Sequence, residues 1–292
     1  MATLVLPSSD PALPAGPAKK GLSPWQKWGM ILIAPYVLVF LVFVVYPVGY
    51  GLWLARHPES YVNLVDDPIF ARSVVNTLVF LIVGINFKMI VALFLSGFFV
   101  QARTWIKWLS LVFILPWAVP SIPTILSIRF MFNPEWGIIN HFVFSLTGDD
   151  GPNWLNDPTL ALSLAVLVHI WKSLPFWTVI FLSARRGIPR QLYEAASIDG
   201  AGPLQTFRYI SLPMLAGIYL ICTLLSMVFT MGDFTNVQLM TGGGPGDSTH
   251  VLATLAYRYT FRMGKIDWGM GVFATALPVT LLFIFVLIKK IR

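Results

Sequence analysis

Six long apolar stretches constrain this chain more than any other feature of its sequence. A helix needs about 20 mostly apolar residues to cross the hydrocarbon core of a bilayer, which is about 30 Å thick. Its backbone polar groups must satisfy one another, because lipid offers them no hydrogen bonds. The stretches that meet this requirement are 30–54, 74–100, 108–128, 160–184, 212–232 and 268–288. The sequence therefore predicts an all-α integral membrane protein with about six transmembrane helices.

Composition and charge exclude several other classes of protein. Only 11% of the 292 residues are charged and 57% are hydrophobic, whereas about a quarter of the residues of a soluble domain carry a charge. The net charge of +7 arises from basic residues that cluster at the ends of the apolar stretches, as membrane topology requires. We therefore expect no nucleic acid as a partner. The single cysteine, Cys222, excludes an intrachain disulfide and a thiolate metal site.

The positions of lysine and arginine predict the orientation of the helices, because cytoplasmic connections carry an excess of these residues. Twelve lie on one side, namely Lys19, Lys20, Lys27, Arg103, Lys107, Arg185, Arg186, Arg190, Arg208, Lys289, Lys290 and Arg292. Six lie on the other side, namely Arg56, Arg72, Arg129, Arg258, Arg262 and Lys265. We therefore expect both termini and the connections 101–107 and 185–211 to face the cytoplasm.

The chain is expected to divide into a short tail and one membrane domain. Residues 1–28 begin with a proline-rich run that lacks the basic start of a signal peptide, and we interpret them as a disordered cytoplasmic tail. Residues 29–292 are expected to form the transmembrane domain. The outer connections 132–159 and 233–267 are rich in turn residues, although 249–261 is expected to be partly helical and partly embedded. Prolines in the third span predict kinks there.

The segment 192–213 is too polar to span a membrane and too regular for a linker. Apolar residues recur on one face of a first short helix, Gly200, Gly202 and Pro203 end it, and a second apolar pattern follows. Such an element could fill a groove on a soluble partner, with charged contacts from Glu194 and Asp199. It could equally lie on lipid as an interfacial helix. Periodicity alone does not choose between these two interpretations.

The order of residues in this segment resembles the EAA motif of bacterial ABC importer permeases, EAAxxDGAxxxxxFxxIxLP. The matching residues are Glu194, Ala195, Ala196, Asp199, Gly200, Ala201, Phe207, Ile210, Leu212 and Pro213. Gly217 departs from the proline of many members, which concerns local helix geometry. The resemblance implies a type I ABC importer permease fold in which the loop 185–212 forms a cytoplasmic coupling helix. The residues that it implies for docking on the ATPase are Tyr193, Glu194, Ala195, Ala196, Asp199, Gly200 and Ala201.

Further matches resemble the carbohydrate-type permeases, specifically their maltose-F-like or glycerol-phosphate-A-like subunits. They are Ala34-Pro35, Tyr46-Pro47, Asn76-Thr77-Leu78 and Thr241-Gly242-Gly243-Gly244-Pro245. The resemblance implies a permease for a sugar, polyol or related small solute in the bacterial inner membrane. It implies as partners a second permease, two copies of an ATP-binding subunit, an extracytoplasmic solute-binding protein and membrane lipid. ATP and Mg would bind to the ATPase, so this chain would have no catalytic residue, metal or cofactor of its own.

A glycine-rich run in the last outer connection invites a comparison with phosphate-binding loops. It contains Gly242, Gly243, Gly244 and Pro245, but no GxxxxGK[ST] pattern occurs in the chain, so we do not expect it to bind nucleotide. The run is interpreted either as a plain turn or as an outer loop that contacts the binding protein or the mouth of the pathway.

Several polar and aromatic side chains fall inside the predicted spans, where a charge is costly unless it faces water or a partner. We consider six residues for the solute pathway, because polar donors and aromatic rings suit a hydroxyl-rich solute: Asn86, Lys88, His169, Trp171, Lys172 and Trp177. Structural pairing between helices is the alternative for each of the charged ones. The sequence leaves this choice open.

Two other classes of function compete with an importer subunit. An ion-coupled secondary transporter would usually show an internal repeat, and none is evident. An intramembrane enzyme would need catalytic groups, but the chain has no HExxH, no GxSxG and no paired intramembrane carboxylates. Glycerol phosphate remains an alternative solute, with Lys172 as its charge partner.

Overall fold

The computed structural model describes residues 23–101 and 103–291. The described residues fall into two compact units, one up to Gly51 and one from Leu52 on. Most of the predicted tail 1–28 lies outside the described residues, and the first helix begins inside its last part, at Pro24. Among the described residues, five helical segments are long and apolar enough to cross a membrane, and a bent helix pair brings the number to as many as six. The predicted all-helical architecture with about six spans is confirmed.

The first span consists of α1 (Pro24–Phe40), the π-helical turn η1 (Leu41–Val45) and α2 (Tyr46–Leu54). It starts with a capping box, because Ser23 Oγ accepts from the backbone N–H of Gln26 and the Gln26 side chain accepts from the N–H of Ser23. The π-helical turn ends two residues before Pro47, which has no N–H to donate to the preceding turn. No residue of α1 is buried, as expected for a helix covered by lipid or by another chain.

The second unit holds the remaining spans. The second span joins α4 (Pro68–Val79), η2 (Phe80–Ile85) and α5 (Asn86–Phe99), the fourth is α9 (Pro158–Arg186), and the fifth joins α11 (Pro203–Thr206), η3 (Phe207–Ser211) and α12 (Leu212–Met231). α15 (Ile266–Ile291) supplies the last span. The short helix α3 (Pro58–Val65) precedes α4 and packs on α15.

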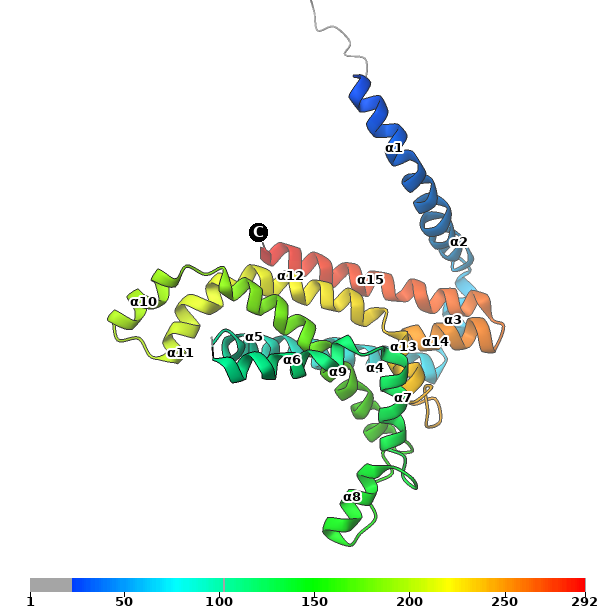
Figure 1. Ribbon diagram of the computed structural model, residues 1–292. Coiled ribbons are helices and arrows are strands. Elements are labelled where there is room, and N and C mark those ends of the chain that lie inside the picture. The colour runs from blue at the N-terminus through cyan, green and yellow to red at the C-terminus, as the bar shows by residue number, and fades with distance from the viewer. Residues whose placement is uncertain (1–22, 102, 292) are drawn as a thin grey trace, which may run out of the picture. The chain divides into compact units, whose positions relative to one another are not determined.

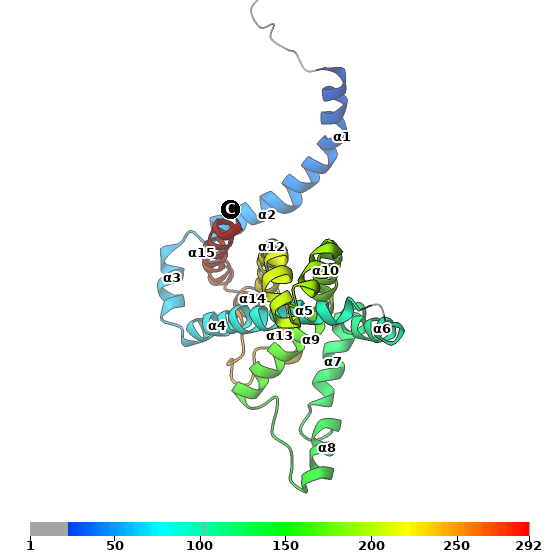
Figure 2. The same cartoon turned by 90° about the vertical axis from the view of Figure 1, so that its left-hand side faces the viewer.

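These helices form one bundle around α9. In Figures 1 and 2 α12 and α15 run alongside each other, and α9 packs against α5, α6 and α12. The central apolar cluster contains Met89 and Ala92 of α5, Trp177 and Phe181 of α9, and Leu215 of the fifth span. Because the interior is filled by α9, its side chains are the ones placed to meet several other helices at once.

The third span is broken. α6 (Thr104–Ala118) and α7 (Ser121–Met131) are bent by 94° at the break, and in Figure 1 α7 leaves the direction of the bundle. Prolines at the break explain this, since a proline cannot donate to the carbonyl four residues earlier. The sequence predicted kinks in this span, but not a turn of this size.

The two connections that the sequence predicts to face outward contain more helix than expected. The connection after α7 holds α8 (Ile138–Thr147), and the one after α12 holds α13 (Phe234–Met240), α14 (Leu252–Tyr257) and the π-helical turn η4 (Arg258–Arg262). The expected helix within 249–261 is therefore present. α13 packs against α7 and α9, which places the start of this connection on the bundle itself.

Candidate functional site

The EAA segment forms the helix, turn and second helix that the sequence predicted. α10 (Arg190–Ile198) ends at Asp199, the turn uses Gly200 with a φ of 77°, and α11 begins at Pro203. The segment lies at one end of the bundle (Figure 1). The Tyr193 hydroxyl of α10 lies 3.1 Å from Oγ of Ser211, the last residue of η3, and this contact attaches α10 to the fifth span.

The outward face of the EAA segment exposes both polar and apolar side chains. Ile198, at the end of α10, is 86% exposed. Glu194 forms an exposed ion pair with Arg190, with Oε1 3.1 Å from Nε. Of the other predicted docking residues, Ala195, Asp199 and Gly200 are exposed, while Ala196 and Ala201 are half-buried. A short amphipathic element with exposed apolar residues is suited to a groove on another protein.

A buried polar network lies at the centre of the bundle. Lys88 of α5 is 1% exposed, and its Nζ lies 2.8 Å from His169 Nε2 of α9 and 3.4 Å from Thr230 Oγ1 of α12. His169 Nδ1 lies 2.7 Å from Asp233 Oδ2, just after α12. The network therefore ties three spans together through a lysine, a histidine and a carboxylate.

The partners determine which ring nitrogen carries the proton. A carboxylate only accepts, so His169 donates from Nδ1 to Asp233, and its Nε2 is then free to accept from the Lys88 ammonium. Thr230 donates to the carbonyl of Ser226 at 2.7 Å and can accept from Lys88. His169 thus connects the Lys88 cation to the Asp233 anion, which form no direct ion pair with each other. A charge at this depth of the membrane needs such a partner.

Lys172 has a different task. Its Nζ donates to the carbonyls of Pro116 and Val119, at 2.8 Å each. In a continuous helix these carbonyls would accept from residues 120 and 123, but both are prolines and have no N–H. Lys172 therefore supplies the donors that are missing at the break between α6 and α7.

A polar cleft of about 340 Å³ opens beside these two groups. It is lined by Trp117, Ser121, Ile125, Val168, His169, Lys172, Ser173, Phe229, Gly232, Asp233, Thr235 and Asn236. Asn236 is 4% exposed and donates from Nδ2 to the carbonyl of Ala165, while its Oδ1 has no hydrogen-bond partner. The cleft therefore offers a carboxylate whose orientation His169 fixes, while the unpaired Asn236 Oδ1 is buried in its wall.

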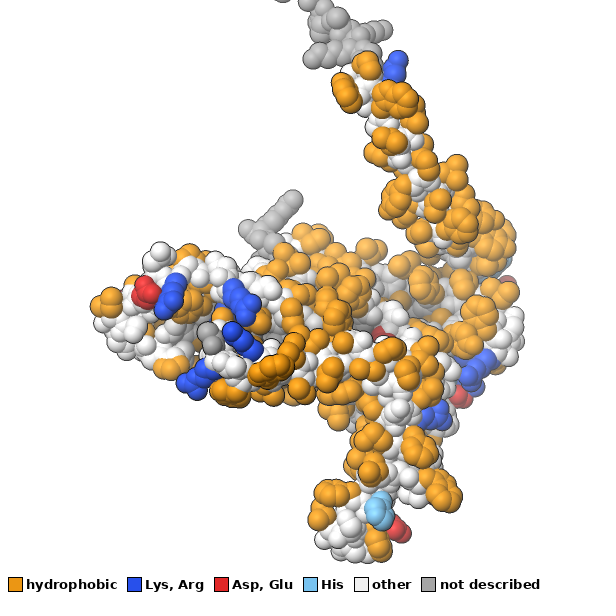
Figure 3. Space-filling view, in the orientation of Figure 1, with side chains coloured by type: hydrophobic (Ala, Val, Ile, Leu, Met, Phe, Trp, Pro, Cys, Tyr) orange, Lys and Arg blue, Asp and Glu red, His pale blue; other side chains and the backbone are white. Residues whose placement is uncertain are grey.

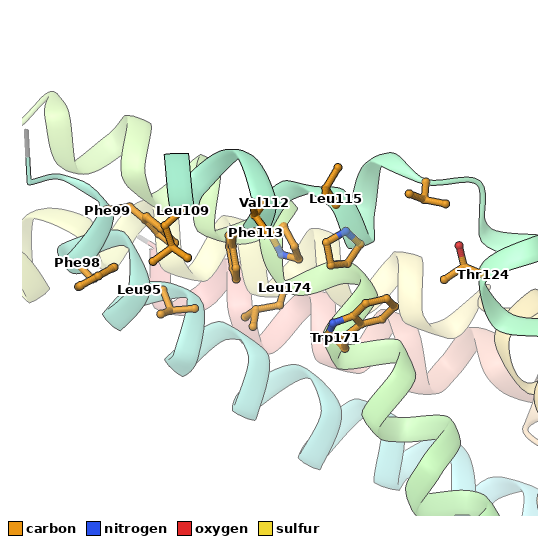
Figure 4. A pocket seen from close by; sticks show the side chains of 13 residues that line it. Leu95, Phe98, Phe99, Leu109, Val112, Phe113, Leu115, Thr124, Trp171 and Leu174 are labelled. Carbon is orange, nitrogen blue, oxygen red and sulfur yellow. The ribbon is translucent and has the colours of Figure 1, made fainter. Parts of the chain in front are cut away.

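The remaining predicted pathway residues lie elsewhere. Trp171 lines a separate apolar pocket of about 630 Å³ between α5, α6 and α9, together with Leu95, Phe113 and Leu174 (Figure 4). Trp177 is 2% exposed and belongs to the core. Asn86 is exposed and donates to the carbonyl of Ile82 in its own helix. The structure thus brings together His169 and Lys172 at the cleft, with Lys88 directly behind.

The glycine-rich run in the connection between α12 and α15 forms a compact turn. Gly242 and Gly243 have φ values of 63° and 92°, and an added Cβ at Gly243 would lie 2.1 Å from the His250 ring. Only glycine accommodates both the conformation and the contact. Asn76 of α4 donates to the carbonyls of Ser248 and His250, at 2.8 and 2.9 Å. Gly244 and Pro245 line a second polar cleft with Arg129 and Glu135.

Comparison with known proteins places this architecture in a family. The family model for the inner membrane component of binding-protein-dependent transport systems matches residues 88–291, which is more than half of the chain and includes both the EAA segment and the cleft. The chain belongs to this family. Its assignment to the carbohydrate-type ABC permeases agrees with the relatives that it resembles.

One relative of this permease is the trehalose/maltose transport system permease protein MalF of Thermococcus litoralis, 30% identical over 90% of this chain and 92% of the relative. Another is the sn-glycerol-3-phosphate transport system permease protein UgpA of Pectobacterium atrosepticum, 31% identical over 79% of this chain and 82% of the relative. A crystal structure of a bacterial ABC transporter involved in alginate import contains a chain with a TM-score of 0.78 at 23% identity, covering 92% of this permease and 95% of that chain. That likeness confirms the type I permease fold.

Nothing in the sequence pattern indicated Asp233, Thr230 or Asn236 as site residues. Asp233 and Asn236 fall at the border between a span and the connection that follows it, where polar residues are ordinary. The available signal was indirect, because buried Lys88 and His169 each needed a partner. Among the described residues, no group of three or more His, Cys, Asp or Glu side chains is placed to hold a metal ion.

Proposed function

We propose that this permease and a second permease subunit enclose the pathway of an ATP-driven importer for a sugar, polyol or related small neutral solute. Both termini would face the cytoplasm. Two ATP-binding subunits would hydrolyse ATP with Mg, and an extracytoplasmic solute-binding protein would deliver the solute. The single observation that carries the proposal is the exposed EAA segment on a chain of this family.

The EAA segment is suited to transmit motion from the ATPase. Its helix α10 is joined to the bundle through Tyr193 and Ser211 and continues through α11 and η3 into the fifth span. A rigid displacement of α10 by the ATPase would therefore reach α12 and the cleft at its far end. Coupled rigid-body movement of this kind can open one side of a pathway while it closes the other.

The polar cleft supports a neutral, hydroxyl-rich solute. The Asp233 carboxylate lines the cleft, its side chain is partly exposed, and it would accept hydrogen bonds from solute hydroxyl groups. Ser121 and Thr235 add hydroxyl groups to the same lining.

The alternative of glycerol phosphate is less well supported by the same geometry. Lys172 would have to serve as its charge partner, but its ammonium already donates to two carbonyls. Asp233 would in addition repel an anion in this cleft. A secondary transporter is disfavoured because the family depends on binding proteins.

The test of docking uses the permease co-expressed with its partner subunits and reconstituted in proteoliposomes. We expect Glu194→Ala to abolish ATP hydrolysis stimulated by the loaded binding protein while the complex still assembles. Two variants on the same helix serve as controls. Gln191→Ala removes a neighbouring exposed side chain, and Arg190→Ala breaks the ion pair but keeps the glutamate; an exposed pair of this kind contributes only about 0.3–0.5 kcal/mol.

The outcome separates the competing functions. If Glu194→Ala alone loses stimulated hydrolysis, the EAA segment docks on the ATPase. If the wild-type chain transports solute in the absence of ATP and partner subunits, the importer proposal is wrong. Uptake of labelled sugars, polyols and glycerol phosphate by wild type and Asp233→Asn then tests the solute class, since removing the carboxylate charge should improve uptake of an anion and weaken uptake of a neutral polyol.

A further inference from the structure

A buried arginine without a carboxylate partner lies at the same end of the bundle as the EAA segment. Arg185 is in the last turn of α9 and is 8% exposed. Its Nε donates to Ser96 Oγ at 3.1 Å and its Nη2 to the carbonyl of Leu93 at 3.2 Å. None of the ion pairs between described residues includes it. A guanidinium keeps its charge in proteins, so a cation withdrawn from water here lacks an anion.

This arginine lines a pocket of about 790 Å³ that is otherwise mainly apolar. Phe94 of α5 and Phe207 of η3 stack in its wall, with ring centroids 5.1 Å apart, and Leu204 of α11 completes that side. Gly97 lies against the guanidinium, since a Cβ there would be 3.5 Å from Arg185 Cζ. No aspartate or glutamate is among the lining residues. The pocket thus combines one cationic wall with an apolar remainder.

The position of the pocket limits what can occupy it. α9 ends at Arg186, so the pocket lies where a span meets the membrane surface. Lys and Arg side chains gather over this end of the bundle in Figure 3, which gives the surface a positive potential. A ligand that matches needs an anionic group for the guanidinium and an apolar body for the phenylalanine wall. Basic pockets between transmembrane helices on the cytoplasmic side bind anionic lipid headgroups in this way.

We propose that Arg185 and this pocket bind the phosphate of an anionic phospholipid, with an acyl chain against Phe94, Phe207 and Leu204. The phosphate accepts charge-assisted hydrogen bonds from the guanidinium. The lipid lies between α5 and the α10–α11 segment, because both contribute to the pocket. It therefore supports the EAA segment from its inner side, and this role is separate from docking on the ATPase and from solute binding.

The test measures retention of phosphatidylglycerol by the full-length chain, purified in detergent with the subunits that accompany it. Native mass spectrometry during titration with phosphatidylglycerol gives the apparent affinity for the tightest lipid. We expect Arg185→Gln to weaken it about tenfold, as loss of one hydrogen bond to a charged group predicts. Arg186→Gln is the matched control, because it removes the same charge from the exposed neighbouring residue and should leave this affinity unchanged. Arg185→Lys keeps the charge and should retain most of the binding.

A second variant distinguishes a lipid from other anions and guards against misfolding. Leu204→Gln changes an exposed wall residue, so it should fold, and it should weaken phosphatidylglycerol binding without affecting inorganic phosphate. Equal retention by wild type and Arg185→Gln overturns the proposal. So does displacement of the lipid by inorganic phosphate in wild type and Leu204→Gln alike, which would indicate a site for a soluble anion. Loss of a partner subunit from Arg185→Gln with lipid retained would assign the arginine to a carboxylate of that subunit and would also overturn it.

Discussion

At the level of single residues, the buried lysine Lys88 shows how a charge persists at membrane depth. It donates to a neutral His169, which in turn donates to Asp233, so each member of the network needs the next. Removing one member of a buried ionic network costs about 3–5 kcal/mol, because a partner is left uncompensated. Removing two neighbours together should cost less than the sum, since residues in one network are not additive.

A double-mutant cycle tests this dependence. We expect His169→Leu to destabilise the permease by about 3–5 kcal/mol, because Lys88 then retains only Thr230 as a partner. The double variant Lys88→Met/His169→Leu should be more stable than His169→Leu, since it no longer buries an unpaired ammonium. The measurement is the free energy of unfolding in detergent micelles, with exposed Lys107→Met as a control for loss of charge. Additive effects of the two substitutions would contradict the network.

At the level of elements, the break between α6 and α7 is stabilised from another helix. Lys172 of α9 donates to the two carbonyls that Pro120 and Pro123 leave without donors. We expect Lys172→Met to lower the free energy of unfolding. Each of the two hydrogen bonds from the charged ammonium contributes about 1.5–3 kcal/mol, and the substitution removes both. Lys172→Arg keeps the donors and should remain close to wild type. Thermal unfolding in detergent measures both, and equal stability of Met and Arg variants would refute the assignment.

The glycine-rich loop between α13 and α14 should respond to pH through His250. Burial holds the pKa of His250 below its usual value, and Arg258 and Arg262 act in the same direction, whereas Asp247 opposes them. Because the folded loop disfavours the protonated ring, its stability is fully present above the unfolded pKa of about 6.5 and is lost as the pH falls below it. Hydrogen exchange of 241–251 between pH 8 and 5 should therefore show falling protection at acid pH. His250→Gln should abolish this pH dependence, and an unchanged profile in that variant would contradict the role of the ring.

The elements were more predictable from sequence than the site. Hydrophobic length alone located the spans, because lipid imposes it, and the motif located α10 and its turn. The 94° break depends on which carbonyls the prolines leave free and on a lysine more than fifty residues away, so local sequence could not supply it. The partner of His169, Asp233, is likewise 64 residues away. Such pairings between helices follow from packing, which a single sequence does not reveal.

At the level of the whole molecule, the two ends of the bundle should respond differently to the ATPase. The EAA end exposes Arg190, whose side chain is 90% exposed, on a short helix that can open locally. The opposite end exposes Arg262, the last residue of η4. If α10 docks on the ATPase and the orientation is as proposed, trypsin should cleave after Arg190 in the permease without the ATPase and should be blocked in the full complex. Cleavage after Arg262 is the internal control and should proceed at the same rate in both samples. Mass spectrometry of the fragments distinguishes the two sites. Protection of Arg262 with Arg190 still cleaved would place the ATPase at the other end of the bundle and would contradict the proposed orientation. Protection of Arg190 alone would show that the ATPase binds at the end of the bundle that carries the exposed EAA segment and the positive surface, as the family relationship leads us to expect.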